Sequence, residues 1–326
     1  MPLKNISNRN NNPRWGEKPY YSLDYYLKEQ YGQKIYKLAL DAGMSCPNRD
    51  GTLDTRGCIF CSGGGSGEFA TSLTGGLSVL KLVDQAINFL TSRKKYTGEA
   101  YIAYLQSFSN TYAPIGKLQE IYHEILKHPK IVGLSVGTRP DCFSEETYQL
   151  LEECSHRKPV WIELGLQTIH ESTAQFIRRG YSLPVFEKCV QNLRKRGIPV
   201  IVHIILGLPG ESEQDILETV RYLNGQGIQG IKFQLLHILQ GTDLAKMLPR
   251  LKIYSQDEYI SVLLKCIAHL SPDIVIHRLT GDGPKELMIA PGWSQHKRNV
   301  LNQIAHTMKE QNIYQGKEYH QKGGIL

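Results

Sequence analysis

The sequence predicts an α/β protein built as a partial (β/α)6 barrel with a C-terminal extension. Six short segments rich in Val, Ile and aromatic residues alternate with stretches of helical patterning. From the second segment onward, the strand starts follow one another at intervals of about 30 residues, the length of a βα unit with its return crossover. A doubly wound sheet would show the same alternation, but no Gly-x-Gly-x-x-Gly follows any of these segments.

The predicted strands are short and bounded by polar residues, as in a buried parallel sheet. They lie at 34–41, 100–106, 132–138, 160–166, 199–206 and 230–236. The intervening helices are expected at 77–90, 115–127, 145–154, 171–178, 185–196 and 213–223. Ser144 is a helix-start signal and Gly197 a helix-stop signal. The first crossover is longer than the others because it contains a cysteine-rich loop as well as a helix.

The domain organisation follows from where this alternation begins and ends. Residues 1–19 are polar and rich in asparagine, so a loose arm is expected there. The barrel is expected to occupy residues 20–245. Residues 246–326 should form an extension packed on the barrel, with a helix at 256–270, a strand at 273–278 and a helix at 295–308.

Composition limits the class of protein. The chain has 326 residues, 41% of them hydrophobic, which is enough for a sizeable core. The first residues lack an apolar signal stretch and no apolar run approaches bilayer length, so we expect a cytoplasmic protein with no membrane partner. The net charge of +7 permits a polyanionic partner, although ordinary scatter of surface charge would also produce it.

Three cysteines in one glycine-rich loop are the strongest chemical signal. Cys46, Cys58 and Cys61 have the spacing C-x11-C-x2-C. Structural zinc usually takes four Cys or His ligands, and residues 1–100 contain no histidine, so a zinc site would need a distant fourth ligand. A redox-active pair at Cys58 and Cys61 is a less favoured interpretation, because no helix begins at this C-x2-C after a strand. The remaining cysteines are scattered and predict no second cluster: Cys142, Cys154, Cys189 and Cys266.

Three thiolates suit a [4Fe–4S] cluster in which one iron remains open to another ligand. S-adenosylmethionine bound there through its amino and carboxylate groups can be cleaved by an electron from the cluster. The product is a 5′-deoxyadenosyl radical, which abstracts hydrogen from unactivated carbon. The electron would come from a donor such as flavodoxin or ferredoxin, and the protein supplies placement and exclusion of water.

The segment Gly57-Cys58-Ile59-Phe60-Cys61 resembles the end of a radical S-adenosylmethionine signature. This resemblance implies a barrel of the radical S-adenosylmethionine type, with Phe60 near the adenine of the cofactor. Phe60 could equally anchor the loop as a plain apolar residue. The long spacing after Cys46 is similar to the stretched loop of the radical domain in the Elongator catalytic subunit.

Polar residues follow the second and third strands, where a barrel concentrates its chemistry. Gln106, Ser107 and Asn110 could hold the ammonium and carboxylate of the cofactor, or could form a capping turn. The sequence Thr-Arg-Pro-Asp around Arg139 is similar to the same strand end in the Elongator-like subgroup, and Arg139 is a candidate on the substrate side. Gly137 departs from that subgroup, which tends to have glutamate there.

The fourth strand carries Glu163 and Gln167 on one face, which is inward if Gln167 meets the ligand. Glu163 needs a partner, because a buried carboxylate is costly without one. The resemblance implies that Gln167 and Arg179 bracket the cofactor. Arg178 and Arg179 could instead be cations that favour a helix C-terminus.

The last two strands complete the candidate site. The turn that begins at Gly207 resembles the adenine-contacting strand of the superfamily, and glycine there would allow close approach of a ligand. His203 occupies the place of an acidic ribose contact in some relatives, or is a satisfied core histidine. Lys232 and His237 could face the substrate or extend to solvent at the barrel rim.

Segments 276–283 and 290–293 resemble a family of short radical S-adenosylmethionine proteins linked to hypermodification of the wobble uridine of transfer RNA. This implies an enzyme that acts on the C5 substituent of that uridine, for example carboxymethylaminomethyl to aminomethyl. Trp15 and Tyr21 could stack on splayed bases or pack against the barrel. Two alternatives remain: a radical enzyme for a small metabolite such as a porphyrinogen, and a zinc-stabilised RNA-binding protein without activity.

Overall fold

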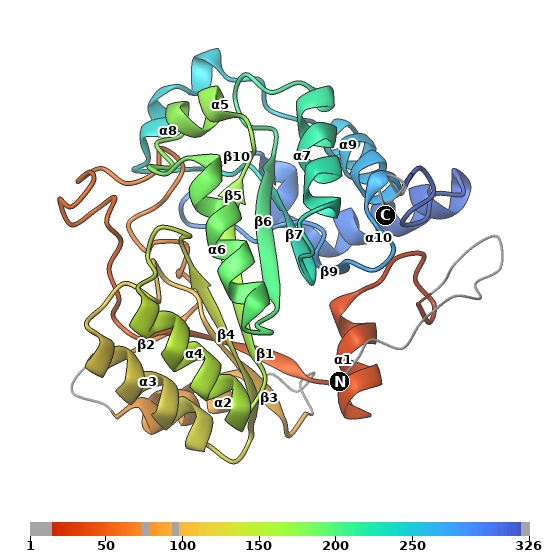
Figure 1. Cartoon of the computed structure of the whole chain (residues 1–326). Coiled ribbons are helices and arrows are strands. Elements are labelled where there is room, and N and C mark those ends of the chain that lie inside the picture. Colours follow the sequence, from red (N-terminus) through yellow and green to blue (C-terminus); the bar gives the residue numbers. More distant parts are fainter. Residues whose placement is uncertain (1–14, 74–77, 93–97, 321–326) are drawn as a thin grey trace, which may run out of the picture.

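The computed structural model describes residues 15–73, 78–92 and 98–320. Most of the expected arm at 1–19 therefore lies outside the described residues. The described part is organised around one curved sheet, with helices packed along its outer side (Figure 1).

The sheet contains eight strands, all paired in parallel, in the order β2-β1-β3-β4-β5-β6-β7-β9. Its edges are β2 and β9, so the barrel is open and the predicted α/β partial barrel is confirmed. The strands are β1 (Tyr36–Asp41), β2 (Thr71–Ser72), β3 (Tyr101–Leu105), β4 (Ile131–Thr138), β5 (Val160–Gln167), β6 (Val200–Leu206), β7 (Gly230–Leu235) and β9 (Val275–Arg278).

The six strands predicted for the barrel are all present, and their ends agree to within two residues. The sheet is nevertheless wider than six strands. β2 extends it by two residues at one edge, and β9 pairs with β7 at the other edge. β9 corresponds to the strand expected at 273–278, so the C-terminal extension contributes a strand to the sheet as well as packing against it.

The helices begin and end at local signals. Ser144 Oγ accepts a hydrogen bond from Thr147 N at 3.2 Å at the start of α4 (Glu145–Arg157). Gly197, with φ of 68°, follows the end of α6 (Leu183–Lys195). Among the described residues, no helix combines the length and apolar character that crossing a membrane requires. The longer helices are α2 (Val79–Thr91), α3 (Ile115–Lys127), α4 (Glu145–Arg157), α6 (Leu183–Lys195), α7 (Glu213–Asn224), α9 (Gln256–His269) and α10 (Lys297–Glu310).

Helix α5 (Glu171–Phe176) ends two residues before its predicted end. Ile177 caps it, and Arg178 then takes a positive φ of 56°, a conformation that a helix cannot contain. The turn directs the chain back toward the cysteine loop, where Ile59 N donates to Ile177 O at 3.2 Å.

Helix α1 (Leu23–Tyr31) precedes the barrel and was not predicted. Ser22 caps its start through its side chain, and Gly32, with φ of 67°, ends it. Just before this helix, the ring of Trp15 is buried and stacks on Tyr21 with 5.8 Å between centroids. The sequence left open whether Trp15 stacks on RNA bases or packs against the protein; in the structure, Trp15 packs against the protein.

The alternation of side chains along β5 explains how the sheet positions a site. Ile162, Leu164 and Leu166 are fully buried in the core shared with the outer helices. Glu163, Gly165 and Gln167 lie on the other face, toward the inside of the barrel. The concave face of the sheet is therefore lined by polar side chains, whereas the convex face is apolar.

Candidate active site

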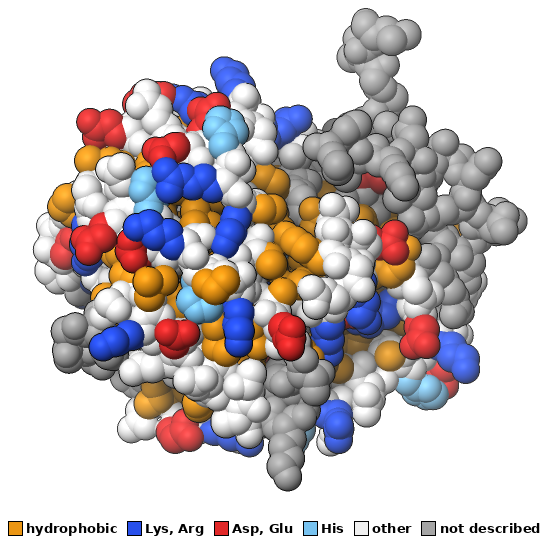
Figure 2. All heavy atoms as spheres, turned by 90° about the horizontal axis from the view of Figure 1, so that it is seen from below, with side chains coloured by type: hydrophobic (Ala, Val, Ile, Leu, Met, Phe, Trp, Pro, Cys, Tyr) orange, Lys and Arg blue, Asp and Glu red, His pale blue; other side chains and the backbone are white. Residues whose placement is uncertain are grey.

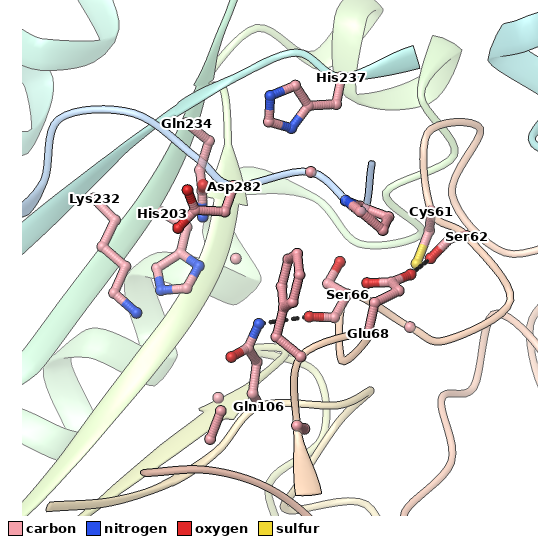
Figure 3. Close-up of a pocket in the computed structure, with 18 of the residues that line it drawn as sticks. Cys61, Ser62, Ser66, Glu68, Gln106, His203, Lys232, Gln234, His237 and Asp282 are labelled. Atoms are coloured by element: carbon pink, nitrogen blue, oxygen red, sulfur yellow. Dashed lines mark hydrogen bonds between the residues drawn. The ribbon is translucent and has the colours of Figure 1, made fainter. Parts of the chain in front are cut away.

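A cavity of about 1540 Å³ occupies the inside of the open barrel. Its wall is formed by the concave face of the sheet, the cysteine loop and residues 282–286 of the extension. In the close-up of Figure 3, Cys61, Ser62 and Glu68 lie on one side, and His203, Lys232 and Gln234 on the other. A volume above the usual upper range of about 1,000 Å³ for ligand sites leaves room for a cofactor together with part of a substrate.

The cysteine loop is held by hydrogen bonds to its own backbone. Arg49 donates from Nη2 to Cys61 O at 2.8 Å and to Ser62 O at 2.5 Å. Gly57 has φ of 76°, and a Cβ there would lie 2.9 Å from Arg49 Nε, so the glycine is required by this close approach. As a result Cys46, Cys58 and Cys61 all line the cavity.

Asn48 is a site residue that the sequence reasoning missed. It is buried, and its Nδ2 lies 3.5 Å from Cys58 Sγ and 2.8 Å from Arg178 O. A Cβ on Gly180 would lie 2.6 Å from Asn48 Oδ1. Asn48 therefore ties the cysteine loop to the turn after α5 while donating toward a thiol. The only indication in the sequence that Asn48 belongs to the site was its position between Cys46 and Cys58, within the long first spacing of the cysteine motif.

The distances between the three cysteine sulfur atoms help to distinguish a mononuclear zinc site from a [4Fe–4S] cluster. A mononuclear tetrahedral zinc site, with Zn–S bonds of about 2.3 Å, requires its sulfurs to lie within roughly 4 Å of one another. In the described residues, the only trio of His, Cys, Asp or Glu with all ligand atoms within 4.8 Å lies elsewhere. Three cavity-facing thiols with a wider spread fit the [4Fe–4S] cluster better than a single zinc ion.

Burial raises the pKa of the Cys58 thiol to about 12, and neighbouring Cys61 adds to the rise, whereas the charge of Arg139 lowers it. Burial also raises the pKa of Cys61, and Arg49 opposes that effect. Cys58 and Cys61 are therefore protonated without metal, and metal binding must release their protons. The two arginines favour the thiolate state that a cluster requires.

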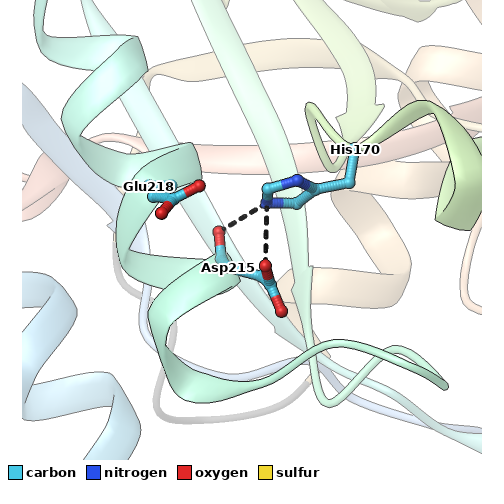
Figure 4. A group of neighbouring side chains, drawn as sticks. All are labelled: His170, Asp215 and Glu218. Atoms are coloured by element: carbon cyan, nitrogen blue, oxygen red, sulfur yellow. Dashed lines mark hydrogen bonds and ion pairs between the residues drawn. The ribbon is translucent and has the colours of Figure 1, made fainter.

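The closely spaced trio consists of His170, Asp215 and Glu218, around the start of α7 (Figure 4). His170 Nε2 lies 2.9 Å from the backbone oxygen of Asp215, which can only accept a hydrogen bond. That nitrogen therefore carries a proton and is not free to bind a metal. Asp215 is engaged in the capping box with Ser212, so this group anchors the helix start.

Phe60 lies between the last two cysteines and lines the cavity. It packs against a buried apolar cluster that includes Ile177, Ile205 and Leu236. Both expectations for Phe60, a place near the adenine of the cofactor and an apolar anchor of the loop, are compatible with this position.

The polar residues after β3 separate into two groups. Gln106 lines the cavity and donates from Nε2 to Ser66 O at 2.5 Å. Ser107 and Asn110 are fully buried behind the wall, and Asn110 Nδ2 donates to Gly137 O at 2.9 Å and to Ser107 O at 3.0 Å. The structure thus brings Gln106 to the site and leaves Ser107 and Asn110 behind its wall. Neither of these two residues caps the following helix, because Pro114 is at the start of α3 and no side chain caps it.

Gln167 ends β5 with φ of 69°, an uncommon conformation for a residue other than glycine. A Cβ on Gly165 would lie 2.8 Å from Gln167 Nε2, so the amide occupies space that Gly165 leaves open. Strained backbone of this kind is concentrated at functional sites. It places the Gln167 side chain on the cavity wall.

Arg179 lines the edge of the cavity but is only 2% exposed. Its guanidinium donates to Thr168 O at 2.6 Å and Tyr181 O at 3.0 Å, and pairs with Glu171 at 3.1 Å. These bonds fix the turn that follows α5. Arg178, its neighbour, pairs with Asp243 at 2.5 Å.

Glu163 is the centre of a buried ionic network. Its carboxylate accepts from Lys37 Nζ at 2.6 Å, Ser135 Oγ at 2.6 Å and His203 Nε2 at 2.7 Å, and it also pairs with Lys232. Burial alone would raise the pKa of Glu163, but the charges of Lys232 and Lys37 hold it well below its usual range. The partner that the sequence required for this carboxylate is therefore a set of four donors.

The histidines of the cavity are neutral. Burial, with the charge of Lys232, lowers the pKa of His203 to about 4, so its Nε2 donates to Glu163 as a neutral ring. Burial likewise lowers the pKa of His237 to about 4. Burial lowers the pKa of Lys232 to about 7 although Glu163 raises it, so this ammonium is poised near neutrality.

For two further candidates, Arg139 and Gly207, the structure shows contacts that the sequence did not indicate. Arg139 lines the cavity near the cysteines, makes two hydrogen bonds to Asp141 at 2.7 and 2.9 Å, and stacks over Tyr181. Gly207 has φ of 88° but does not line the cavity. The ring of Tyr254, from the extension, lies within 3.2 Å of the position that its Cβ would take.

Two protein-family models match the chain. The model of the Radical SAM superfamily matches residues 55–223, and the model of the Radical_SAM C-terminal domain matches residues 228–310. The uncharacterized protein YtqA of Bacillus subtilis is 42% identical over 92% of this chain and 93% of its own length.

More distant similarities include one relative with a curated name and one solved structure. A tRNA uridine(34) acetyltransferase of Methanocaldococcus jannaschii is 26% identical over 51% of this chain and 31% of its own length. The solved structure of archaeal Methanocaldococcus infernus Elp3 has a TM-score of 0.64 at 16% identity, covering 86% of this chain and 64% of that chain. At such identity, the structural likeness concerns the fold alone.

Proposed function

Since the chain belongs to the radical SAM superfamily, we propose that it modifies transfer RNA by converting the carboxymethylaminomethyl group on C5 of the wobble uridine to aminomethyl. A [4Fe–4S] cluster with S-adenosylmethionine would supply a 5′-deoxyadenosyl radical for hydrogen abstraction. The observation that carries the radical chemistry is the convergence of Cys46, Cys58 and Cys61 on a large polar cavity. The wobble uridine as substrate is supported by the similarity to a tRNA uridine(34) acetyltransferase.

The residues around the cavity have separate parts in this proposal. Gln106 and Gln167 offer uncharged donors and acceptors on the wall, suited to the polar groups of the cofactor. Phe60 offers an apolar surface for the adenine. Arg139, close to the thiols and already paired with Asp141, contributes positive charge beside the cluster. An electron donor of the flavodoxin or ferredoxin type is part of the same proposal.

The surface limits where transfer RNA can bind. On the face shown in Figure 2, the coloured Lys and Arg side chains are interspersed with Asp and Glu. This face therefore has no continuous basic area, although the chain carries a net charge of +7. We expect the anticodon to approach the cavity wall instead, where Lys285 and Lys297 contribute positive charge.

The substrate is tested by nucleoside mass spectrometry of transfer RNA from cells that lack this protein. We expect the aminomethyl wobble uridine and its derivatives to disappear and the carboxymethylaminomethyl form to accumulate. Restoring the wild-type gene should reverse both changes. An unchanged wobble-uridine profile would remove this substrate and leave a small metabolite as the alternative.

Gly165→Ala should weaken S-adenosylmethionine binding by about tenfold, because the new Cβ displaces the Gln167 amide and removes about one hydrogen bond. The fold should lose little stability, since the displaced atom is the end of a flexible side chain. Binding is measured by calorimetry on the cluster-loaded protein. Gly116→Ala is the matched control, because its Cβ would meet nothing within 4 Å. Unchanged affinity in Gly165→Ala would argue against Gln167 as a cofactor contact.

A further inference from the structure

Positive side chains outnumber negative ones in the inner part of the cavity, around Lys232. Lys37, Lys232 and Arg278 project from three different strands and all line the cavity. Glu163 is the carboxylate that faces Lys37 and Lys232. The one carboxylate offsets the charge of Lys37. Lys232, whose pKa burial lowers to about 7, carries part of a further positive charge near pH 7, before Arg278 is counted.

Arg278 lacks a carboxylate partner within ion-pair distance in the part of the chain that the structure describes. Its Nη1 donates to Gln234 Oε1 at 3.3 Å. In the sheet, Arg278 of β9 is the ladder partner of Lys232 of β7. The two strands are parallel and their register shifts just before Lys232, but both side chains line the same cavity, where like charges repel each other. An anion bound between the two side chains would offset that repulsion.

The other nearby titratable groups do not change this charge balance. His203 and His237 are neutral near pH 7, because burial lowers their pKa values to about 4. His277, also on the wall, is neutral for the same reason. Asp282 faces the cavity but pairs with Lys297 at 2.5 Å.

We infer that Lys232, Arg278 and Gln234 form a subsite for a carboxylate group of the substrate. A guanidinium binds a carboxylate through two parallel hydrogen bonds, and the Lys232 ammonium adds a third donor. Gln234 holds the Arg278 side chain and orients it. This inference rests on the proposed function, in which the carboxymethyl end of the wobble substituent brings the carboxylate.

A second source of the same chemistry is the carboxylate of S-adenosylmethionine itself. The cysteine loop and the Lys232 side chain lie on opposite sides of the cavity in Figure 3. A carboxylate bound to the cluster is therefore expected near Cys61, and the subsite is left for the substrate. The experiment must distinguish binding of the substrate carboxylate from binding of the S-adenosylmethionine carboxylate.

The test uses N-methylglycine and its neutral amide as probes, which reproduce the end of the substituent with and without the carboxylate charge. Both are titrated by calorimetry into cluster-loaded protein that already holds S-adenosylmethionine. The acid should bind at least tenfold more tightly than the amide. Arg278→Gln should reduce that preference to less than threefold and Arg278→Lys should retain part of it. Lys188→Gln, which removes an exposed cation of α6 outside the cavity, should retain all of it.

Two results would overturn the inference. Equal binding of acid and amide by the wild-type protein removes the subsite, whatever the wobble-uridine profile shows. If Arg278→Gln weakens S-adenosylmethionine as much as N-methylglycine, the carboxylate belongs to the cofactor and the substrate assignment is wrong. A clear preference for the acid together with an unchanged wobble-uridine profile would support the subsite and refute the transfer RNA proposal.

Discussion

Cys58→Ala is expected to lower S-adenosylmethionine-dependent release of 5′-deoxyadenosine by more than about a hundredfold. Loss of residues that merely support a metal ligand already costs about 10–100-fold, and Cys58 is a proposed ligand itself. With two thiolates left, the cluster should be lost or converted to a form without an open iron. Iron and sulfide content and deoxyadenosine by liquid chromatography are measured on the same anaerobic sample.

Cys189→Ala provides the matched control. Cys189 is a buried thiol of α6 in the apolar core and lies outside the cysteine loop. It should retain wild-type iron content and activity apart from a small loss of stability. Full deoxyadenosine production by Cys58→Ala would show that the cluster assignment is wrong.

Glu163→Gln is expected to destabilise the fold by about 3–5 kcal/mol, because removing one partner of a buried ion pair leaves uncompensated charge. Lys37 and Lys232 would both lose their carboxylate, and the Lys232 side chain is only 4% exposed. The pKa of Glu163 is depressed in the folded state, so its contribution is present above the unfolded pKa of about 4.3 and is lost as pH falls through the folded value. Urea unfolding at pH 7 therefore measures it in full.

Glu153→Gln is the comparison for that change. Glu153 is about half exposed and pairs with Arg157 on the surface of α4. Exposed pairs contribute about 1 kcal/mol or less, so Glu153→Gln should be nearly neutral. If both variants lose less than about 1 kcal/mol, the Glu163 network does not stabilise the barrel.

The sequence was most informative where local patterns decide the structure. The six strands followed from apolar runs of strand length, and the Cys58-Ile59-Phe60-Cys61 segment indicated the radical chemistry that the superfamily match supports. The alternation along β5 also placed Glu163 and Gln167 on one face correctly. Each of these inferences needed only neighbouring residues.

Features that depend on distant contacts could not be predicted in the same way. The four partners of Glu163 come from β1, β4, β6 and β7, and only the strand order brings them together. Tyr254 covers Gly207 from the extension, which no pattern around Gly207 indicates. Between Ser107 and Asn110, which lie behind the wall, Phe108 takes a positive φ of 59°, which is uncommon for a residue other than glycine and was not indicated by the sequence.

The central claim is that three thiolates hold a cluster with a coordination position open to S-adenosylmethionine. It is tested most directly by electron paramagnetic resonance of the anaerobically reconstituted, dithionite-reduced protein, recorded before and after the cofactor is added. We predict the signal of a reduced [4Fe–4S] cluster and a clear change in its g values when S-adenosylmethionine binds. A protein that takes up zinc but no iron, or a cluster signal that the cofactor leaves unchanged, would contradict the claim.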